Sequence, residues 1–519
     1  MATVLSATPG LLKIADLAAT RAFLAQLAAA TPAQRQAQLL TQLRLLADTR
    51  IRGNQRLHIL EALRDTALEA QHARSREYWG KPVPHDNDTR EIFERSVALW
   101  RALADAYESL IADMAGAAPE LAEDAALICY RALRFTGFAM TAHNRAYHAV
   151  PGALWEQLHR LYAFAESAEV TATPVAEGAD STSTVNLAYL QIVLAQRASP
   201  EALSLQQMSA VDRALAQWVA LGRLSKEPTG ANSDLALAVD LGSAQGARRI
   251  KNLQGDNLRH LDLEQIGDQL RQTAIALKSQ SPGKLGFGAI SREASEQLML
   301  NLNTQWFAPG SGRSDERKSA PFNVMMSGTI AAMHFNISGK PFAPPDAGLS
   351  SRARFEMAGF DRVDGPVGEA SVRSRTLETW TVVNQSPSGI LGKCGHLSST
   401  TRLAHNQLLG LVAPNGSTYI GVAQRLLVET DGTVWLGFRL LRAKAHAVAA
   451  RVSDISTPYD RALLLDATVG GEPPSILINT GTYAPSRVLD MHDGRPHRIR
   501  LTALLDSGPN FERATYAAA

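Results

Sequence analysis

Two short motifs in the second half of the chain carry residue types that suit a planar anionic ligand. The first is Arg313-Ser-Asp-Glu-Arg317, which follows the Gly- and Pro-containing stretch 308–312 and is therefore predicted to be a loop. A guanidinium group can stack on a purine ring, and it can also donate paired hydrogen bonds to phosphate or to the Hoogsteen edge of guanine. Two arginines four residues apart on one loop are therefore candidates for wrapping such a ligand.

The second motif is Asn384-Gln-Ser386-Pro-Ser-Gly389, which lies within a strand-rich region. The Asn384 and Ser386 side chains offer hydrogen-bond donors and acceptors, and Gly389 would let the backbone come close to a ligand. The alternative interpretation is a plain β-turn, because Asn, Ser, Pro and Gly are also the usual turn residues. For the arginine motif the alternative is a solvated charged loop.

The sequence lacks the common enzyme motifs. GKLGFG (283–288) does not have the spacing of a phosphate-binding P-loop, and there is no G-x-S-x-G elbow and no H-E-x-x-H pair. His143 and His148 are five residues apart, so they do not share a helix face and are interpreted as ordinary packed or surface residues. We therefore expect no catalytic residues and no metal ligands.

The first half of the chain is predicted to be helical. Thr31-Pro32 is typical of an N-cap followed by Pro in the first turn. In 90–115, apolar and aromatic residues recur at spacings of three and four, which predicts a helix with one buried face. Similar helices are expected in 55–78, from Pro151 onward, and in 184–197, 205–224, 262–278 and 292–307. Short connections favour a helical bundle or helical-hairpin array over 1–225, followed by a mixed connecting segment at 226–304.

From about residue 320 the apolar residues alternate with a period of two. Asn415-Gly416 and Asp431-Gly432 are typical of hairpin turns between short strands. The strand-like runs are 322–337, 379–394, 407–412, 418–430 and 434–441. They predict an antiparallel β-barrel at 305–450 with an insertion at 338–372. A β-rich extension at 451–519 either completes the barrel or forms a separate unit, and the whole is a multidomain α + β protein.

Composition excludes several classes of protein. The 519 residues are 45% hydrophobic and 20% charged, which indicates a globular protein of several domains. A formal net charge of +2 provides no overall attraction to nucleic acid or to an anionic membrane. Cys129 and Cys394 are too few for a disulfide framework, and no apolar run is long enough to span a bilayer. We therefore expect a cytoplasmic protein with free thiols.

The two motifs together resemble the PilZ domain family, the bacterial receptors for cyclic di-GMP. That family carries R-x-x-x-R on a loop before the first strand of a six-stranded barrel, and Arg313 and Arg317 match it. Its second motif is [DN]-x-S-x-x-G on a following strand, which Asn384, Ser386 and Gly389 match. The strand pair 418–441 is also similar to later strands of the family. The resemblance covers about 305–450, and the long helical region ahead of it is similar to that of some bacterial proteins with a PilZ-like domain.

This resemblance implies a non-catalytic cyclic di-GMP effector with no cofactor. Arg313 and Arg317 would contact phosphate and guanine, Asn384 and Ser386 would bind a guanine edge, and the helical region would contact an unidentified protein partner. Two features support an alternative, a PilZ-like scaffold that has lost nucleotide binding and acts through protein contacts. Residues 318–383 separate the two motifs, which is a longer gap than is usual in the family. Asp315 and Glu316 lie between the two arginines and partly cancel their positive charge. A hydrolase or transferase with an unrecognised site is a third hypothesis.

Overall fold

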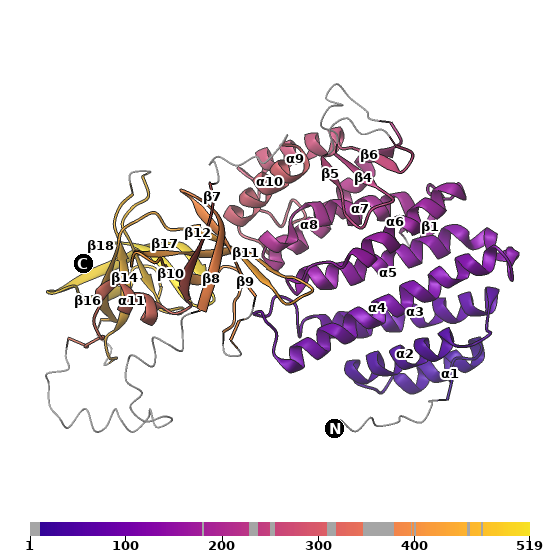
Figure 1. Cartoon of the computed structure of the whole chain (residues 1–519), viewed down its shortest axis with the longest axis horizontal. Coiled ribbons are helices and arrows are strands. Elements are labelled where there is room, and N and C mark those ends of the chain that lie inside the picture. Colours follow the sequence, from indigo (N-terminus) through magenta and orange to yellow (C-terminus); the bar gives the residue numbers. More distant parts are fainter. Residues whose placement is uncertain are drawn as a thin grey trace. The chain divides into compact units, whose positions relative to one another are not determined.

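The computed structural model describes residues 11–178, 181–227, 237–249, 255–308, 318–345, 378–395, 397–398, 401–453, 457–468 and 471–519. The chain forms two compact units (Figure 1). One unit comprises Met1–Lys81 and His85–Gly312, and the other comprises Pro82–Pro84 and Arg313–Ala519. The first contains most of the helices, and the second contains two β-barrels.

The first unit is an array of helices in which most neighbours in sequence are also neighbours in space (Figure 1). Thr31 caps α2 through a capping box with Gln34, and Pro32 occupies the first turn, as the sequence predicts. The helices are α1 (Leu17–Leu27), α2 (Pro32–Ala47), α3 (Gly53–Ser75), α4 (Asn87–Met114), α5 (Ala125–Arg145), α6 (Gly152–Ser167), α7 (Val185–Arg197), α8 (Leu205–Trp218), α9 (Glu264–Ala276) and α10 (Arg292–Trp306). The predicted hairpin-array arrangement therefore describes this region.

The apolar stripe expected in 90–115 lies on α4. Phe93, Trp100 and Tyr107 are buried on this helix, and Trp100 and Tyr107 both stack against Phe135 of α5. Helix α5 is nearly enclosed, because its successive residues Ile128 to Arg131 are all buried. Short strands complete the unit: the pair β1 (Val175–Ala176) and β2 (Thr182–Ser183), and a four-stranded sheet of β3 (Arg223–Ser225), β6 (Leu258–Asp262), β4 (Leu237–Asp240) and β5 (Arg248–Arg249).

The second unit contains two closed six-stranded antiparallel barrels. The first consists of β7 (Lys318–Ser327), β8 (Glu378–Ser386), β9 (Gly389–Cys394), β10 (Leu408–Val412), β11 (Thr418–Val428) and β12 (Val434–Leu440). The second consists of β13 (Ala445–Val452), β14 (Asp460–Leu465), β15 (Ser475–Ile478), β16 (Val488–His492), β17 (Pro496–Gly508) and β18 (Phe511–Ala518). The predicted fold class, a helical region followed by a C-terminal antiparallel barrel, is confirmed.

The two barrels share one connectivity. Numbered within each barrel, the strands follow the spatial order 1-2-3-6-5-4 around the closed sheet. The C-terminal residues thus form a barrel of their own, which resolves the two possibilities that the sequence leaves open for 451–519. The expected hairpin turns are present in the first barrel, where Gly416 and Gly432 have φ angles of +81° and +86°. These left-handed conformations explain why both turns place glycine after Asn or Asp.

Helix α11 (Ile330–Ser338) corrects the prediction that 322–337 is one strand-like run. Thr329 caps its start by accepting a hydrogen bond from Ala332 N, and Gly339 ends it with φ +66°. Ile330 and Met333 are buried on this helix against strands of both barrels. The spacing of three residues between Ile330 and Met333 fits one face of a helix, and their apolar character also fits a buried strand. The sequence alone therefore did not distinguish a helix from a strand in this segment.

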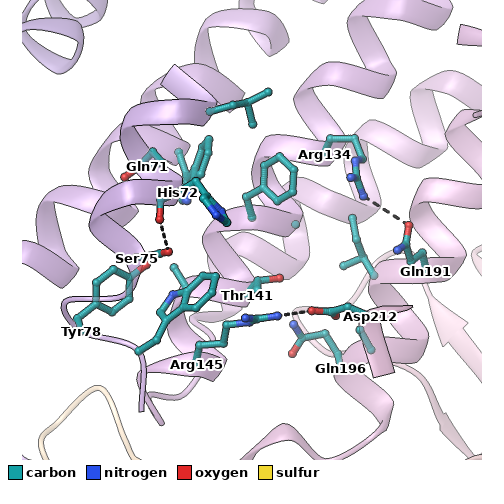
Figure 2. A pocket seen from close by; sticks show the side chains of 18 of the residues that line it. Gln71, His72, Ser75, Tyr78, Arg134, Thr141, Arg145, Gln191, Gln196 and Asp212 are labelled. Carbon is teal, nitrogen blue, oxygen red and sulfur yellow. Dashed lines mark hydrogen bonds and ion pairs between the residues drawn. The ribbon is translucent and has the colours of Figure 1, made fainter. Parts of the chain in front are cut away.

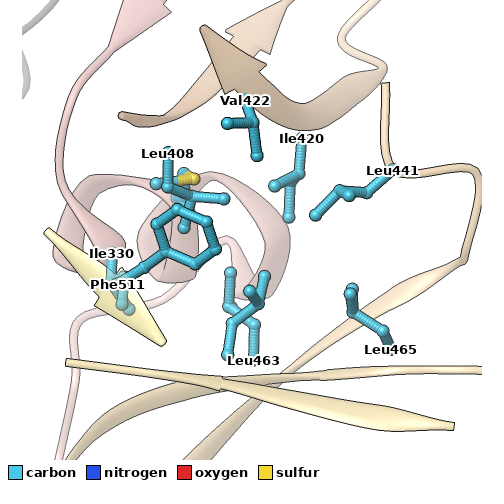
Figure 3. Close-up of a cluster of buried hydrophobic side chains, with 10 residues drawn as sticks. Ile330, Leu408, Ile420, Val422, Leu441, Leu463, Leu465 and Phe511 are labelled. Atoms are coloured by element: carbon cyan, nitrogen blue, oxygen red, sulfur yellow. The ribbon is translucent and has the colours of Figure 1, made fainter. Parts of the chain in front are cut away.

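One apolar core joins the two barrels around α11 (Figure 3). It contains Leu408, Ile420 and Val422 of the first barrel together with side chains of the second. The members from the second barrel are Leu463, Leu465, Leu477 and Phe511. Ala462, Ile476 and Ile478 belong to a separate apolar cluster. Along β14 and β15 they alternate with the residues of the first cluster, because successive residues of a strand point to opposite faces. The strands of the second barrel are therefore buried on both faces where they meet α11.

Candidate ligand-binding site

The hairpin of β8 and β9 brings the three residues of the second motif to one end of the first barrel. Ser386 is the last residue of β8 and lies opposite Gly389, the first residue of β9. Asn384 lies opposite Leu391, and the register shifts between Val382 and Asn384. Such an irregularity re-aims side chains near a strand end. The structure therefore places Asn384, Ser386 and Gly389 around a single tight turn.

Hydrogen bonds and close backbone packing hold this turn. Ser386 Oγ lies 3.3 Å from the Gly389 carbonyl oxygen and 3.3 Å from Ser388 Oγ. A Cβ atom added to Gly389 would lie 2.9 Å from the Phe438 carbonyl oxygen of β12. Glycine at 389 is thus required by the approach of two backbones inside the barrel.

Arg313 and Arg317 lie outside the described residues. The described part of β7 begins at Lys318, which directly follows Arg317 in the sequence. Lys318 pairs with Gln385, and Ser319 pairs with Asn384. The chain therefore enters the first barrel beside the strand that carries Asn384 and Ser386.

A cavity of about 590 Å³ lies next to the β8–β9 turn. Pro387 of the turn lines it, together with Tyr419 of β11 and the segment that leaves β12. That segment supplies Arg442 and Lys444, whereas none of the described residues lining the cavity carries a carboxylate. The Tyr419 side chain is 43% exposed. The cavity thus combines an accessible aromatic ring with two cations, an arrangement that suits an anion with a planar group.

Sequence reasoning missed Tyr419, Arg442 and Lys444. Tyr419 lies in the strand-like run 418–430, where it is exposed although the four residues that follow it, Ile420 to Ala423, are all buried. Arg442 and Lys444 are more than fifty residues from Asn384, and only the closed barrel brings these segments together.

The two histidines that the sequence singled out pack around Phe93 in the helical unit. The His148 ring stacks on Phe93 with centroids 4.8 Å apart, and the His143 ring meets it edge-on at 5.2 Å. Burial lowers the pKa of His143 to about 4 and that of His148 to about 3. Both imidazoles are therefore neutral near pH 7.

Comparison with protein-family models finds two matches in this chain. Residues 18–229 match the model described as "Cyclic-di-GMP receptor FimW, N-terminal domain". Residues 446–519 match the model described as "FimW C-terminal beta-barrel domain". The first match covers α1 to α8 and continues into β3, and the second covers almost the whole second barrel.

The helical region and the second barrel thus match the N-terminal and C-terminal domains of one receptor class, the cyclic-di-GMP receptors. The two matches together span more than half of the 519 residues, and the chain belongs to the FimW family of cyclic-di-GMP receptors. The function predicted from the sequence is confirmed at the level of this family.

Neither match includes the first barrel or its two motifs. No curated protein sequence matches the chain. Among the described residues, no helix combines the length and the apolar character needed to cross a bilayer.

Proposed function

We propose that the first barrel is a PilZ-like domain that binds cyclic di-GMP at the β8–β9 turn. Membership of a family of cyclic-di-GMP receptors supports cyclic di-GMP as the ligand. The closed six-stranded sheet agrees with the barrel that the resemblance to the PilZ family implies. The observation that carries the proposal is the cavity beside Pro387, which is lined by Tyr419, Arg442 and Lys444 and by no carboxylate among the described residues. Cyclic di-GMP is a dianion with two planar bases, so it complements this surface.

In this proposal the two motifs act together. Arg313 and Arg317 bind phosphate and stack on guanine, because a guanidinium group does both. Asn384 and Ser386 bind a guanine edge from the end of β8, and Gly389 keeps the backbone of the turn close to β12. The pairing of Lys318 with Gln385 supports this arrangement, since the arginine motif directly precedes Lys318 in the sequence.

The proposed role is that of a non-catalytic effector in a bacterial cytoplasm. The family description names a receptor, and ligand binding would change how the helical unit meets an unidentified protein partner. Cys129 and Cys394 are both buried and are not joined to each other by a disulfide, which agrees with a reducing compartment. The alternative is a scaffold in which the first barrel no longer binds nucleotide. Titration of the chain with cyclic di-GMP distinguishes the two hypotheses.

Titration of cyclic di-GMP into variants of the cavity wall tests the proposed location. Tyr419→Ala removes the exposed ring, and Lys444→Gln removes one cation without shortening the side chain much. Each should weaken binding about threefold to thirtyfold, since stacking and cationic contacts at exposed sites are each modest. Tyr459→Ala, at a tyrosine beside Arg451 in the second barrel, is the matched control. Unchanged affinity in both cavity variants would place the ligand elsewhere.

A further inference from the structure

A second cavity of about 590 Å³ lies wholly within the helical unit (Figure 2). Helices α3, α4, α5, α7 and α8 and the residues that follow α3 form its walls. All these residues fall within the part of the chain that matches the FimW N-terminal model. None of them belongs to the site proposed for cyclic di-GMP in the first barrel, so this cavity requires its own explanation.

Aromatic rings form much of the wall. Trp79 follows α3, Trp100 comes from α4 and Phe138 comes from α5. The Trp100 and Phe138 ring centroids are 5.0 Å apart, and the Phe138 side chain is only half-buried. The cavity therefore presents ring surface against which a flat ligand can stack.

The wall of the cavity also contains polar side chains. The side chains of Thr141 and Gln196 are half-buried and, among the described residues, make no hydrogen bond (Figure 2). Gln71, in contrast, has a partner at both ends of its amide, since it donates to Ser96 O at 2.7 Å and accepts from Gln36 at 2.7 Å. A hydroxyl and a primary amide can each donate and accept hydrogen bonds. Thr141 and Gln196 can therefore bind a ligand edge that carries both donors and acceptors.

The two arginines that line the cavity are each paired with a carboxylate. Arg145 is paired with Asp212 and lies over the Trp79 ring, 4.0 Å from its centroid (Figure 2). Arg134 lies 3.2 Å from a Glu177 oxygen and donates to Gln191. A phosphate group would have to compete with these carboxylates for both guanidinium groups. The electrostatics therefore favour an uncharged ligand over a nucleotide.

We propose that this cavity binds an uncharged purine base or nucleoside. A purine is flat enough to stack on Phe138 and Trp100, and its edge carries donors and acceptors for Thr141 and Gln196. The volume lies in the range of small-molecule sites in proteins and accommodates a base with its ribose. The chain therefore has a ligand site in the helical unit that is distinct from the barrel.

Calorimetric titration of the full chain with guanosine and with adenosine tests the proposal, with uridine for comparison. Saturable binding of a purine nucleoside below about 1 mM is the expected result. Ala195→Phe should abolish it, because Ala195 lines the cavity and a benzyl group would fill the space. Ala25→Phe makes the same substitution at an exposed alanine of α1 and should bind normally. Thr141→Val, which keeps the side-chain shape, should weaken binding about threefold to tenfold.

Two results would overturn the inference. The first is absence of purine binding to the wild-type chain, and the second is wild-type affinity in both Ala195→Phe and Thr141→Val. Circular dichroism of each variant establishes that the helices are intact, and Thr141→Val keeps the test valid if Ala195→Phe is misfolded. Cyclic di-GMP binding should not change in either variant. If Ala195→Phe abolishes it while the helices stay intact, the nucleotide occupies the helical cavity and the uncharged-ligand inference is wrong.

Discussion

Lys318 and Gln385 lie directly opposite each other on neighbouring antiparallel strands of the first barrel. Lys318 follows the arginine motif in the sequence, and Gln385 lies between Asn384 and Ser386 of the second motif. Residues 319–384 separate the two positions along the chain, so only closure of the sheet brings them together. The strand that follows the arginine motif in the sequence therefore pairs with the strand that carries the second motif.

The arginine motif should dominate the affinity for cyclic di-GMP. Arg317→Ala removes charge-assisted hydrogen bonds worth about 1.5–3 kcal/mol, whereas Asn384→Ala removes a neutral one worth about 0.5–1.5 kcal/mol. Titration should therefore show losses of roughly tenfold or more for Arg317→Ala and a smaller loss for Asn384→Ala. Wild-type affinity in both variants would contradict the proposed site.

Gly389→Ala should destabilise the first barrel independently of any ligand. The added Cβ would lie 2.9 Å from the Phe438 carbonyl oxygen, so one of the two strands must shift. We expect a loss of about 1–3 kcal/mol in the free energy of unfolding, measured with urea. Gly395→Ala is the matched control, because a Cβ there meets no atom within 4 Å. Equal stability of the two variants would show that the turn relaxes at no cost.

Phe511→Ala should weaken both barrels. Phe511 is fully buried in the core around α11, which also contains Leu408 and Ile420 of the first barrel. Removing the ring should cost about 3–5 kcal/mol. Hydrogen exchange should then rise in β8 and in β15 alike, while Leu504→Ala, at a 43% exposed position, should have little effect. Increased exchange confined to the second barrel would mean that the barrels are energetically independent.

The Glu166–Arg259 pair should make the stability of the helical unit depend on pH. Arg259 Nε donates to Glu166 at 2.8 Å, and this hydrogen bond lowers the pKa of the carboxyl below its usual value. A lowered folded-state pKa stabilises the fold above the unfolded pKa of about 4.3, and that contribution is lost as pH falls through the folded pKa.

Thermal unfolding between about pH 6 and pH 3 measures this contribution. Glu166→Gln should be less stable than the wild type at pH 6 but should lose less stability on acidification. Glu123→Gln, at an exposed position with no ion pair among the described residues, is the control. Identical pH dependence in Glu166→Gln and the wild type would show that the pair contributes nothing.

Sequence patterns predicted most of the elements, and their failures have physical causes. Helix α4 was predictable because one face is exposed and its apolar residues keep a clear period. No pattern indicated α5, where Ile128 to Arg131 are buried one after another, so no polar face marks the helical period. Helix α11 was mistaken for strand because nine mostly apolar residues fit either period.

The candidate site was only partly predictable for a similar reason. Asn384, Ser386 and Gly389 form a local motif, and their turn could be expected from turn chemistry alone. Tyr419 and Lys444 line the adjacent cavity from other strands and segments, and the order of strands around a closed sheet is not encoded in any local pattern. The predicted limits of the domains, and the roles of Arg313 and Arg317, stay predictions.

Calorimetric titration of the purified full chain with cyclic di-GMP tests the central proposal most directly, with GTP and cyclic di-AMP as controls. We expect saturable binding of cyclic di-GMP, much weaker binding of both controls, and an affinity that falls as salt is raised, because the proposed contacts are ionic and exposed. Absence of cyclic di-GMP binding, or equal affinity for all three nucleotides, would contradict it and favour the scaffold alternative.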